Sequence, residues 1–437
     1  MRILASRLAT ALHGTLDGPD VELNGLAIDS RVVQPGQLFA AVKGERDGHD
    51  FVGAARTAGA GAVLVERLGA DGDGGGATSI VVTDVATALG DLARAVRAEL
   101  PDRVVGVTGS VGKTTTKDLL ATVLGQRFRT AASEKSFNNE LGVPLTLANA
   151  PDGVEAVVVE MGARGAGHIA LLCEMASPTI GVVTTVEGVH TEVMGGLEQI
   201  ARAKGELVEA VPADGTVVLN AEVPLVLGMR SRTQATVVTF GAGGHVVAEQ
   251  VEVDEELRPR FLLRSDWGSV DVRLSVRGVH NVGNALAAAA VGLSAGVALA
   301  EVADGLASST QSPWRMDLRR APSGAQVLND SYNAGPASMA AALRALASLP
   351  ARRHVAVVGL MAELGDTAPE EHRRIAALAG ELGVELVAVG TDLYGMEPVA
   401  DTEAAIQALG QLGEGDAVLV KGSRVAGLEV LAEALLT

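Results

Sequence analysis

A short segment with two glycines, one lysine and four threonines offers the clearest chemistry in this chain. Residues 108–116 read Thr-Gly-Ser-Val-Gly-Lys-Thr-Thr-Thr and lie between an apolar segment and an expected helix. Small residues let successive backbone N–H groups face an anion, and the start of a helix adds a favourable potential. An ordinary glycine turn is the alternative, but the strand before it and the Lys-Thr pair favour nucleotide binding.

Two residues of this segment, which we call the glycine loop, carry the expected chemistry. The Lys113 ammonium supplies a charge for the outer phosphates, and the Thr114 hydroxyl is a ligand for Mg²⁺. Val107 stands where the common P-loop has its first glycine, so this is the shorter Gly-x-x-Gly-Lys-Thr form. Kinases, GTPases and ligases all use such a loop, so it does not choose a reaction. The residues expected to bind ATP here are Gly109, Ser110, Val111, Gly112, Lys113, Thr114 and Thr115.

Two polar residues follow other expected strands. Glu160 comes directly after the apolar segment 156–159, and His190 follows the expected strand 179–184. Open α/β sheets place ligands at the carboxyl ends of their strands, so both residues are candidate Mg²⁺ ligands. The alternatives are a solvated acid at Glu160 and a surface side chain at His190.

Lys204 is unusual because it falls on the apolar face of an expected helix, 197–211. The apolar residues of this segment recur at the spacing of a buried face. No acidic residue lies three or four positions from Lys204, and an unpaired buried ammonium is costly. The side chain must reach solvent, lose its proton or react. A neutral lysine can capture CO2 as a carbamate, an anion able to bridge Mg²⁺ ions.

Strands and helices alternate around these residues, which predicts α/β domains with parallel sheets. A chain of 437 residues is too long for one core. We expect domains at residues 1–100, 101–311 and 312–437. The expected strands are 103–108, 156–159, 179–184, 216–219, 327–329, 355–358, 386–389 and 417–420, with a β-rich stretch at 240–276. The expected helices are 86–99, 113–124, 197–211 and 281–295, and residues 69–76 are an expected surface loop.

Composition limits the class of protein. The formal net charge of −18 argues against a nucleic-acid partner, because phosphate backbones attract basic surfaces. No apolar run has membrane-spanning length, and no signal peptide is evident at the start, so we expect no membrane insertion. The single cysteine, Cys173, is consistent with a reducing compartment. We therefore expect a cytoplasmic protein.

Together these motifs resemble the Mur ligase family over essentially the whole chain. Residues 201–206, Ala-Arg-Ala-Lys-Gly-Glu, match the segment of the family's carbamylated lysine. The resemblance implies catalytic roles for Lys113, His190 and Lys204, and Mg²⁺ ligation by Thr114, Glu160, His190 and carbamylated Lys204. It also implies three domains: a small α/β domain for a UDP-sugar, a central P-loop ATPase with a parallel sheet, and a Rossmann-like C-terminal domain.

Two segments resemble the family's substrate-binding regions. Asp29-Ser30-Arg31 is similar to a UDP-binding segment, which implies that Ser30 and Arg31 lie near the UDP group. Residues 137–144, Phe-Asn-Asn-Glu-Leu-Gly-Val-Pro, imply a substrate role for Asn138 and Asn139. This second segment is characteristic of members that join D-alanyl-D-alanine to UDP-N-acetylmuramoyl-tripeptide through an acyl phosphate, forming a peptidoglycan precursor. The resemblance implies that the enzyme works as a monomer.

Further segments resemble the parts that hold the rest of ATP. Residues 280–286, which start an expected helix, imply adenine contacts from Asn281 and Asn284, although Asn281 could simply cap that helix. In the last domain the resemblance implies contacts with the ribose and γ-phosphate. The residues concerned are Arg315, Asp330, Tyr332 and Asn333.

The sequence departs from the family at two places and leaves alternatives open. The loop before His190 reads Thr-Val-Glu-Gly-Val instead of Asn-Val-Gly-Pro-Ala, and Leu360 replaces an expected aspartate. One alternative is another ligase of the family, adding a single amino acid or adding glutamate to a folate. A second is an inactive nucleotide-binding scaffold. A P-loop kinase or GTPase is disfavoured, because neither needs a lysine like Lys204.

Overall fold

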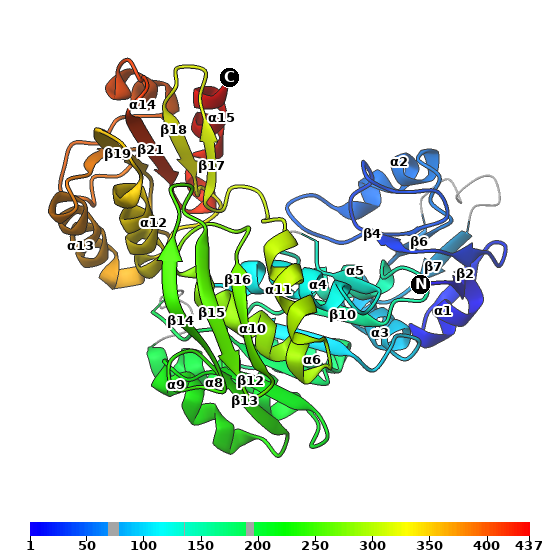
Figure 1. Cartoon of the computed structure of the whole chain (residues 1–437). Helices are drawn as coiled ribbons and strands as arrows, with labels where there is room; N and C mark the ends of the chain where they lie inside the picture. The colour runs from blue at the N-terminus through cyan, green and yellow to red at the C-terminus, as the bar shows by residue number, and fades with distance from the viewer. Residues whose placement is uncertain (69–77, 135, 189–195) are drawn as a thin grey trace.

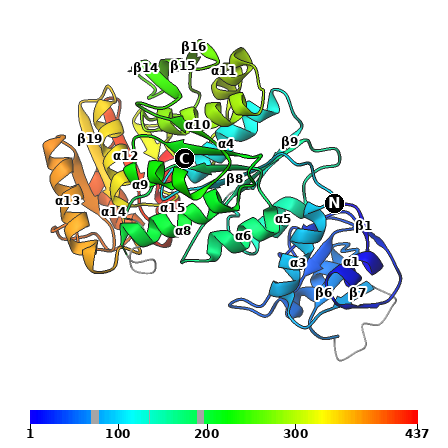
Figure 2. The same ribbon diagram turned by 90° about the horizontal axis from the view of Figure 1, so that it is seen from below.

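The computed structural model describes residues 1–68, 78–134, 136–188 and 196–437. Three large sheets of the described residues follow one another along the chain, and each is flanked by helices (Figure 1). The parts that hold the first and third sheets lie at opposite ends of the central part in both views (Figures 1 and 2). The predicted α/β fold class is confirmed, and the sheets occupy residues 15–81, 104–273 and 317–421. The domain boundaries stay a prediction.

The first domain is built on a small mixed sheet. Its strand order is β2-β7-β6-β5-β4, with only β2 antiparallel to its neighbour. The strands are β2 (Thr15–Asp17), β4 (Leu26–Ala27), β5 (Leu38–Ala40), β6 (Ala62–Val65) and β7 (Thr78–Val81), and β1 (Ile3–Leu4) pairs with β3 (Glu22–Leu23) apart from this sheet. The helices are α1 (Ala5–Ala11), α2 (Val52–Thr57) and α3 (Val85–Arg97).

The central domain has a nine-stranded sheet of order β16-β15-β14-β13-β12-β11-β8-β10-β9. The strands are β8 (Val104–Thr108), β9 (Thr130–Ala132), β10 (Ala156–Glu160), β11 (Ile180–Val183), β12 (Thr216–Asn220), β13 (Thr236–Phe240), β14 (Val246–Val253), β15 (Pro259–Ser265) and β16 (Gly268–Arg273). The helices are α4 (Lys113–Gly125), α5 (Gly142–Ala148), α6 (His168–Ala176), α8 (Leu197–Ala210), α9 (Pro224–Leu227), α10 (Asn281–Ser294) and α11 (Leu299–Ser308), with a 3-10 turn η2 (Gly228–Arg232) after α9.

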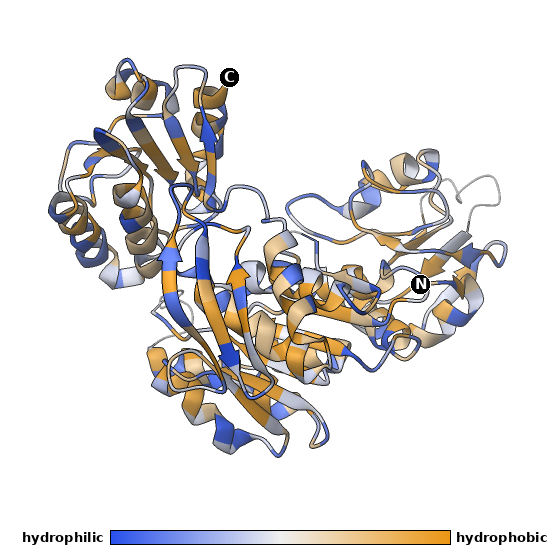
Figure 3. Ribbon diagram, in the orientation of Figure 1, coloured by the Kyte–Doolittle hydropathy of each residue, from blue (hydrophilic) through white to orange (hydrophobic). Residues whose placement is uncertain are grey.

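This sheet is parallel from β9 to β13, as the alternation of strands and helices predicts. The predicted β-rich stretch is also confirmed, and in it β14 and β15, and β15 and β16, pair antiparallel at one edge of this mostly parallel sheet. Every residue of β8 and of β10 is buried, in agreement with their continuous apolar runs. Figure 3 shows hydrophobic residues concentrated on the central strands and the helices packed on them.

The third domain has a sheet of order β17-β18-β21-β19-β20, parallel except for the first pair. Its strands are β17 (Asp317–Arg320), β18 (Gln326–Asn329), β19 (Arg353–Val358), β20 (Glu385–Ala388) and β21 (Asp416–Lys421). Its helices are α12 (Pro336–Ser348), α13 (Ala368–Glu381), α14 (Thr402–Leu409) and α15 (Glu429–Leu436).

The apolar cores show which parts of the chain share an interior. One apolar core joins α1 and α3 to α5 and α6, so the first and central domains share an interior. The main core of the third domain is separate, and of the central domain only Leu257, at the tip of the β14–β15 hairpin, enters it. The third domain is therefore the part of the chain best able to pivot.

Two further expectations concern membrane insertion and a surface loop. Within the described residues, no helix combines the length and the apolar character needed to cross a membrane. The expected surface loop at 69–76 falls outside the described residues.

Candidate active site

The glycine loop joins the carboxyl end of β8 to α4, whose first residue is Lys113. Gly112 has a φ of 87°, and a Cβ added there would overlap Asn284 Oδ1. Gly109 has a φ of 151°, and its Cβ would overlap Thr184 Oγ1. The loop therefore needs glycine at both positions.

The segment after β11 fastens this loop. Ser110 N donates to Thr185 O at 2.9 Å, and Val111 N donates to Thr185 Oγ1 at 3.0 Å. Ser110 Oγ accepts from Glu187 N and donates to Glu187 O. The residues that depart from the family before His190 thus hold the loop.

Amides remain available to an anion at the start of α4. The backbone N–H groups from Gly112 to Thr115 donate no hydrogen bond to a described residue. They are the free donors expected of a helix N-terminus. Because Ser110 and Val111 use their N–H groups within the protein, their contact with ATP stays a prediction.

Lys113 folds back over the loop. Its Nζ donates to Gly109 O at 2.7 Å and to Ser110 O at 3.2 Å. Burial lowers the pKa of Lys113, while Glu160 acts in the opposite direction and Arg315 in the same one. The Lys113 ammonium therefore lies in the field of both Glu160 and Arg315.

Glu160 ends β10 and is 1% exposed. Its Oε1 accepts from Asn138 Nδ2 at 2.8 Å, whereas its Oε2 is buried with no hydrogen-bond partner among the described residues. The solvated alternative is therefore wrong. A buried oxygen without a donor is costly, and a cation would satisfy it. The residues present thus fit Mg²⁺.

Thr114 is reached from the linker to the third domain. Arg315 Nη2 donates to Thr114 Oγ1 at 3.0 Å, and the Arg315 guanidinium lies 4.1 Å from the centroid of the Tyr332 ring. Thr114 Oγ1 is also 3.3 Å from Ser136 Oγ. Thr114, Arg315 and Tyr332, which were all predicted to bind ATP, therefore lie together although they are up to 218 positions apart in the sequence.

Lys204 is 3% exposed, so the interpretation that its ammonium reaches solvent is wrong. Burial, with a smaller effect of Lys113, lowers the pKa of Lys204 to about 7. No hydrogen bond or ion pair joins the Lys204 side chain to another described residue. The predicted apolar face is confirmed around it, except that Leu197 is exposed.

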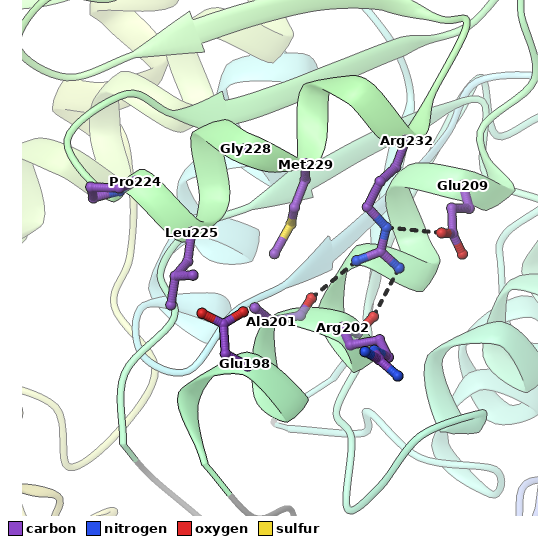
Figure 4. Close-up of a pocket in the computed structure, with 9 residues that line it drawn as sticks. All are labelled: Glu198, Ala201, Arg202, Glu209, Pro224, Leu225, Gly228, Met229 and Arg232. Carbon is purple, nitrogen blue, oxygen red and sulfur yellow. Dashed lines mark hydrogen bonds and ion pairs between the residues drawn. The ribbon is translucent and has the colours of Figure 1, made fainter.

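Helix α8 is held on both sides of Lys204. Glu206 accepts from Gly167 N and Ala170 N, at 2.7 and 3.0 Å, at the start of α6. On the other side Arg232, from η2, donates to Ala201 O, Arg202 O and Glu209 Oε1 (Figure 4). These contacts fix the rotation of α8 about its axis, and with it the direction of the Lys204 side chain.

Gly205→Ala is expected to loosen this arrangement. A Cβ at position 205 would overlap Arg232 Nη1 and displace the guanidinium. The variant loses charge-assisted hydrogen bonds of about 1.5–3 kcal/mol but gains about 1 kcal/mol of helix propensity. We expect its free energy of unfolding in urea to fall by about 1 kcal/mol.

Gly53→Ala is the matched control, because Gly53 lies in α2 with open space around its Cβ position. It is expected to stabilise the fold by about 0.5–1 kcal/mol. Equal gains in the two variants would contradict the role of Arg232.

The predicted asparagines have internal partners. Asn281 Nδ2 donates to Arg277 O at 2.6 Å, and its Oδ1 accepts from Asn284 Nδ2 at 2.7 Å. Asn281 is the first residue of α10 and does not cap it, so that alternative is wrong. Asn139 Oδ1 accepts from Gly142 N at the start of α5. Of the two asparagines predicted to bind substrate, Asn138 is the one that contacts a candidate metal ligand, Glu160.

Lys421 is a residue whose role the sequence did not reveal. It is 2% exposed, and its Nζ donates to Asp330 Oδ2 at 2.5 Å and to Asn333 O at 2.9 Å. Asp330 Oδ1 in turn accepts from Met316 N at 3.0 Å. Lys421 thus holds in place Asp330 and Asn333, two of the residues predicted to bind ATP.

Other predicted residues are not part of this cluster. Ser30 and Arg31 lie in the first domain after β4, where Asp29 pairs with the exposed Arg31 guanidinium. That pair lowers the pKa of Asp29 to about 2. His190 falls outside the described residues. In the described part of the chain, no group of three or more His, Cys, Asp or Glu side chains gathers in one place.

Comparisons with known proteins agree with this arrangement. The family descriptions "Mur ligase family, catalytic domain", "Mur ligase middle domain" and "Mur ligase, glutamate ligase domain" match residues 22–97, 107–292 and 314–424. A UDP-N-acetylmuramoyl-tripeptide–D-alanyl-D-alanine ligase of Mycobacterium tuberculosis is 41% identical, over 93% of this chain and 91% of the relative.

Two solved structures are similar over nearly the whole chain. MurF from Acinetobacter baumannii has a TM-score of 0.88 at 30% identity, covering 100% of this chain and 99% of that one. MurF ligase from Thermotoga maritima in complex with ADP has a TM-score of 0.80 at 28% identity, covering 94% and 97%. With its three domains each matched, this chain belongs to the Mur ligase family.

Proposed function

We propose that this chain joins D-alanyl-D-alanine to UDP-N-acetylmuramoyl-tripeptide at the expense of ATP, which yields the pentapeptide precursor of peptidoglycan. One observation carries the proposal. The free amides of the glycine loop and the unpartnered oxygen of Glu160 lie at the carboxyl ends of the neighbouring parallel strands β8 and β10, and the buried Lys204 is near enough to Lys113 for that charge to lower its pKa. Relatives that are named for this reaction span nearly the whole chain, and a similar structure holds ADP.

The reaction has two steps. A carboxylate oxygen of the tripeptide attacks the γ-phosphorus of ATP, the bond to ADP breaks, and an acyl phosphate forms. The amine of D-alanyl-D-alanine then attacks the acyl carbon, phosphate leaves, and an amide results. Lys113 and the first amides of α4 stabilise the charge that builds on the transferred phosphoryl group.

Mg²⁺ would be held by Thr114 and Glu160, with His190 and carbamylated Lys204 as the second set of ligands. Bound there, it would neutralise phosphate charge during transfer. Thr114 Oγ1 accepts from Arg315 Nη2, so Arg315 would release this oxygen when the metal binds. We propose that Arg315 then turns to the γ-phosphate.

Lys204 supports the carbamate by its burial and its chemistry. A neutral amine reacts with CO2, and a pKa of about 7 leaves half of the Lys204 side chains neutral at pH 7. Carbamylation would also turn an unfavourable buried ammonium into an anion beside Lys113. An ordinary lysine, with a pKa of 10.5, offers almost no neutral amine at that pH.

The carbamate is expected to depend on pH with a defined sign. At fixed CO2 pressure, the neutral fraction of Lys204 falls from roughly nine-tenths at pH 8 to one-tenth at pH 6. We expect the carbamate signal in ¹³C NMR of ¹³CO2-treated protein to fall accordingly, and to be absent in Lys204→Met. A signal that grows as the pH falls would contradict the prediction.

The same shift predicts a stability effect for the unmodified lysine. Its pKa in the fold lies below its ordinary value, so the unfolded chain holds the proton more tightly. The penalty is complete below about pH 7 and disappears as the pH rises toward 10.5.

Release of ADP tests the function. With ATP, Mg²⁺ and UDP-N-acetylmuramoyl-tripeptide, we expect ADP and the pentapeptide product only after D-alanyl-D-alanine is added. Folate with glutamate, or a single amino acid, serves as the competing acceptor system. Product only in those mixtures would favour another ligase of the family, and no product in any mixture would favour the scaffold. We also propose that the chain acts as a monomer, in the cytoplasm where its nucleotide substrates are made.

A further inference from the structure

Asp118, one turn after Lys113 on α4, contacts the linker to the third domain. Its Oδ2 accepts from Ser312 Oγ at 2.6 Å and from Ser312 N at 3.1 Å. Its Oδ1 lies 2.8 Å from Lys117 Nζ. The linker, residues 309–316, is therefore attached to the helix that begins at the glycine loop.

The same carboxylate is connected to the strand that carries Glu160. Lys117 is 3% exposed and donates to Ser133 O at 2.8 Å. Ser133 Oγ accepts from Glu160 N at 3.1 Å. Hydrogen bonds and one ion pair thus connect the Glu160 backbone to Ser312 through Ser133, Lys117 and Asp118. These links fix Asp118 relative to the site.

Just beyond Ser312 the linker takes an unfavourable conformation. Trp314 and Met316 have φ of 61° and 47°, which bulky side chains rarely adopt. Such strain persists only where surrounding contacts impose it. Here Tyr332 N donates to Trp314 O, and the Arg424 guanidinium lies 4.6 Å from the centroid of the Trp314 ring.

Arg315 stands between these two residues and reaches Thr114. Its backbone is thus fixed on the third-domain side through Trp314 and Met316, and on the central side through Ser312. The third domain has its own core, so these contacts decide where it pivots. Without the Ser312 contact, the linker would attach to the central domain further from Arg315.

We propose that Asp118 is a positioning residue: by anchoring Ser312 it sets the pivot of the third domain and delivers Arg315 to Thr114. This role deepens the proposed function and its kinetic part rests on it. ATP phosphates would still bind to the central domain without the anchor, but the third domain would close on them less often.

Trp314 reports the state of the linker directly. The chain has two tryptophans, so Trp314 is the single one in a Trp267→Phe background. This replacement should leave the fold intact, because Trp267 is 45% exposed at the β15–β16 turn and lies far along the chain from the linker. We expect Ser312→Ala to raise the acrylamide quenching constant of Trp314 about twofold, because the linker opens locally. Ser312→Thr, which keeps the hydroxyl, is expected to restore the original value.

Ser308→Ala is the matched control, because Ser308 Oγ donates only to Asp304 O and Gly305 O of its own helix. In ligation assays we expect Ser312→Ala to lower kcat about tenfold while the Kd for MgATP changes less than about threefold. Asp118→Asn is expected to lower kcat in the same way. If one of the two variants proves too unstable to assay, the other still tests the proposal.

The proposal requires both the higher quenching constant of Trp314 and the lower kcat in Ser312→Ala. Quenching or kcat of Ser312→Ala equal to that of Ser308→Ala would overturn it, as would a Kd for MgATP that rises as much as kcat falls. A wild-type chain that makes no product would instead refute the proposed function, and the quenching constant would then decide alone whether the anchor exists.

Discussion

Replacing Lys204 by alanine is expected to lower the ligation rate by a factor on the order of 10³ or more. The side chain is buried, unpaired among the described residues and close enough to Lys113 for that charge to lower its pKa. An alanine there cannot become a carbamate, so the second set of metal ligands would be incomplete. Steady-state ADP release with both substrates measures the loss.

Two observations separate this effect from damage to the fold. Removing a buried ammonium takes away a desolvation cost, so the free energy of unfolding of Lys204→Ala is expected to stay equal or rise. A small carboxylate such as acetate should partly restore the rate by occupying the vacated space. Lys43→Ala is the matched lysine control, since Lys43 is half-exposed and pairs with Glu66 in the first domain. Full activity of Lys204→Ala would eliminate the carbamate.

Lys113→Met is the second change with a large expected effect, a loss in kcat/KM of about 10²–10³-fold. Lys113 is the cation of the glycine loop, and its Nζ donates to Gly109 O and Ser110 O. Methionine has nearly the same length but no charge for the transferred phosphoryl group. The measurement is kcat/KM for ATP at saturating acceptor.

Lys113→Met also predicts weaker nucleotide binding, which calorimetry with a non-hydrolysable ATP analogue would detect. Lys43→Met is its control, with the same change at an exposed site. A variant that binds and turns over ATP like the wild type would show that the glycine loop is not the phosphate site.

The residues that could be predicted from the sequence depend on local patterns. The glycine loop follows from small residues between an apolar strand and a helix, and the structure places Lys113 at the first position of α4. The burial of Lys204 follows from the helical spacing of apolar residues around it. The start of that helix was also predicted correctly at Leu197, but the Leu197 side chain lies exposed although it continues the apolar pattern.

The contacts that could not be predicted join distant parts of the chain. Asp118 and Ser312 lie 194 positions apart, and nothing in either neighbourhood signals the pair. Gly205 looks like a poor helix residue until the Arg232 guanidinium is seen against it. Ser110 and Val111 have the sequence of phosphate-binding residues, yet their amides bond to Thr185.

The antiparallel edge was missed for a different reason. Strands β14 to β16 have no helices between them, and their charged residues pair across the hairpins, as Arg264 does with Glu249. Charge pairing of this kind is typical of an exposed antiparallel hairpin, not of a buried parallel strand. That signal was present in residues 246–273.

Transfer of oxygen from the tripeptide to phosphate tests the central claim most directly. With ¹⁸O in both oxygens of the tripeptide's terminal carboxylate, the attacking oxygen becomes the bridge of the acyl phosphate and leaves with phosphorus. Mass spectrometry should therefore find one ¹⁸O in each released phosphate and one in the new amide. Unlabelled phosphate alongside amide product would contradict activation of the carboxylate by phosphorylation.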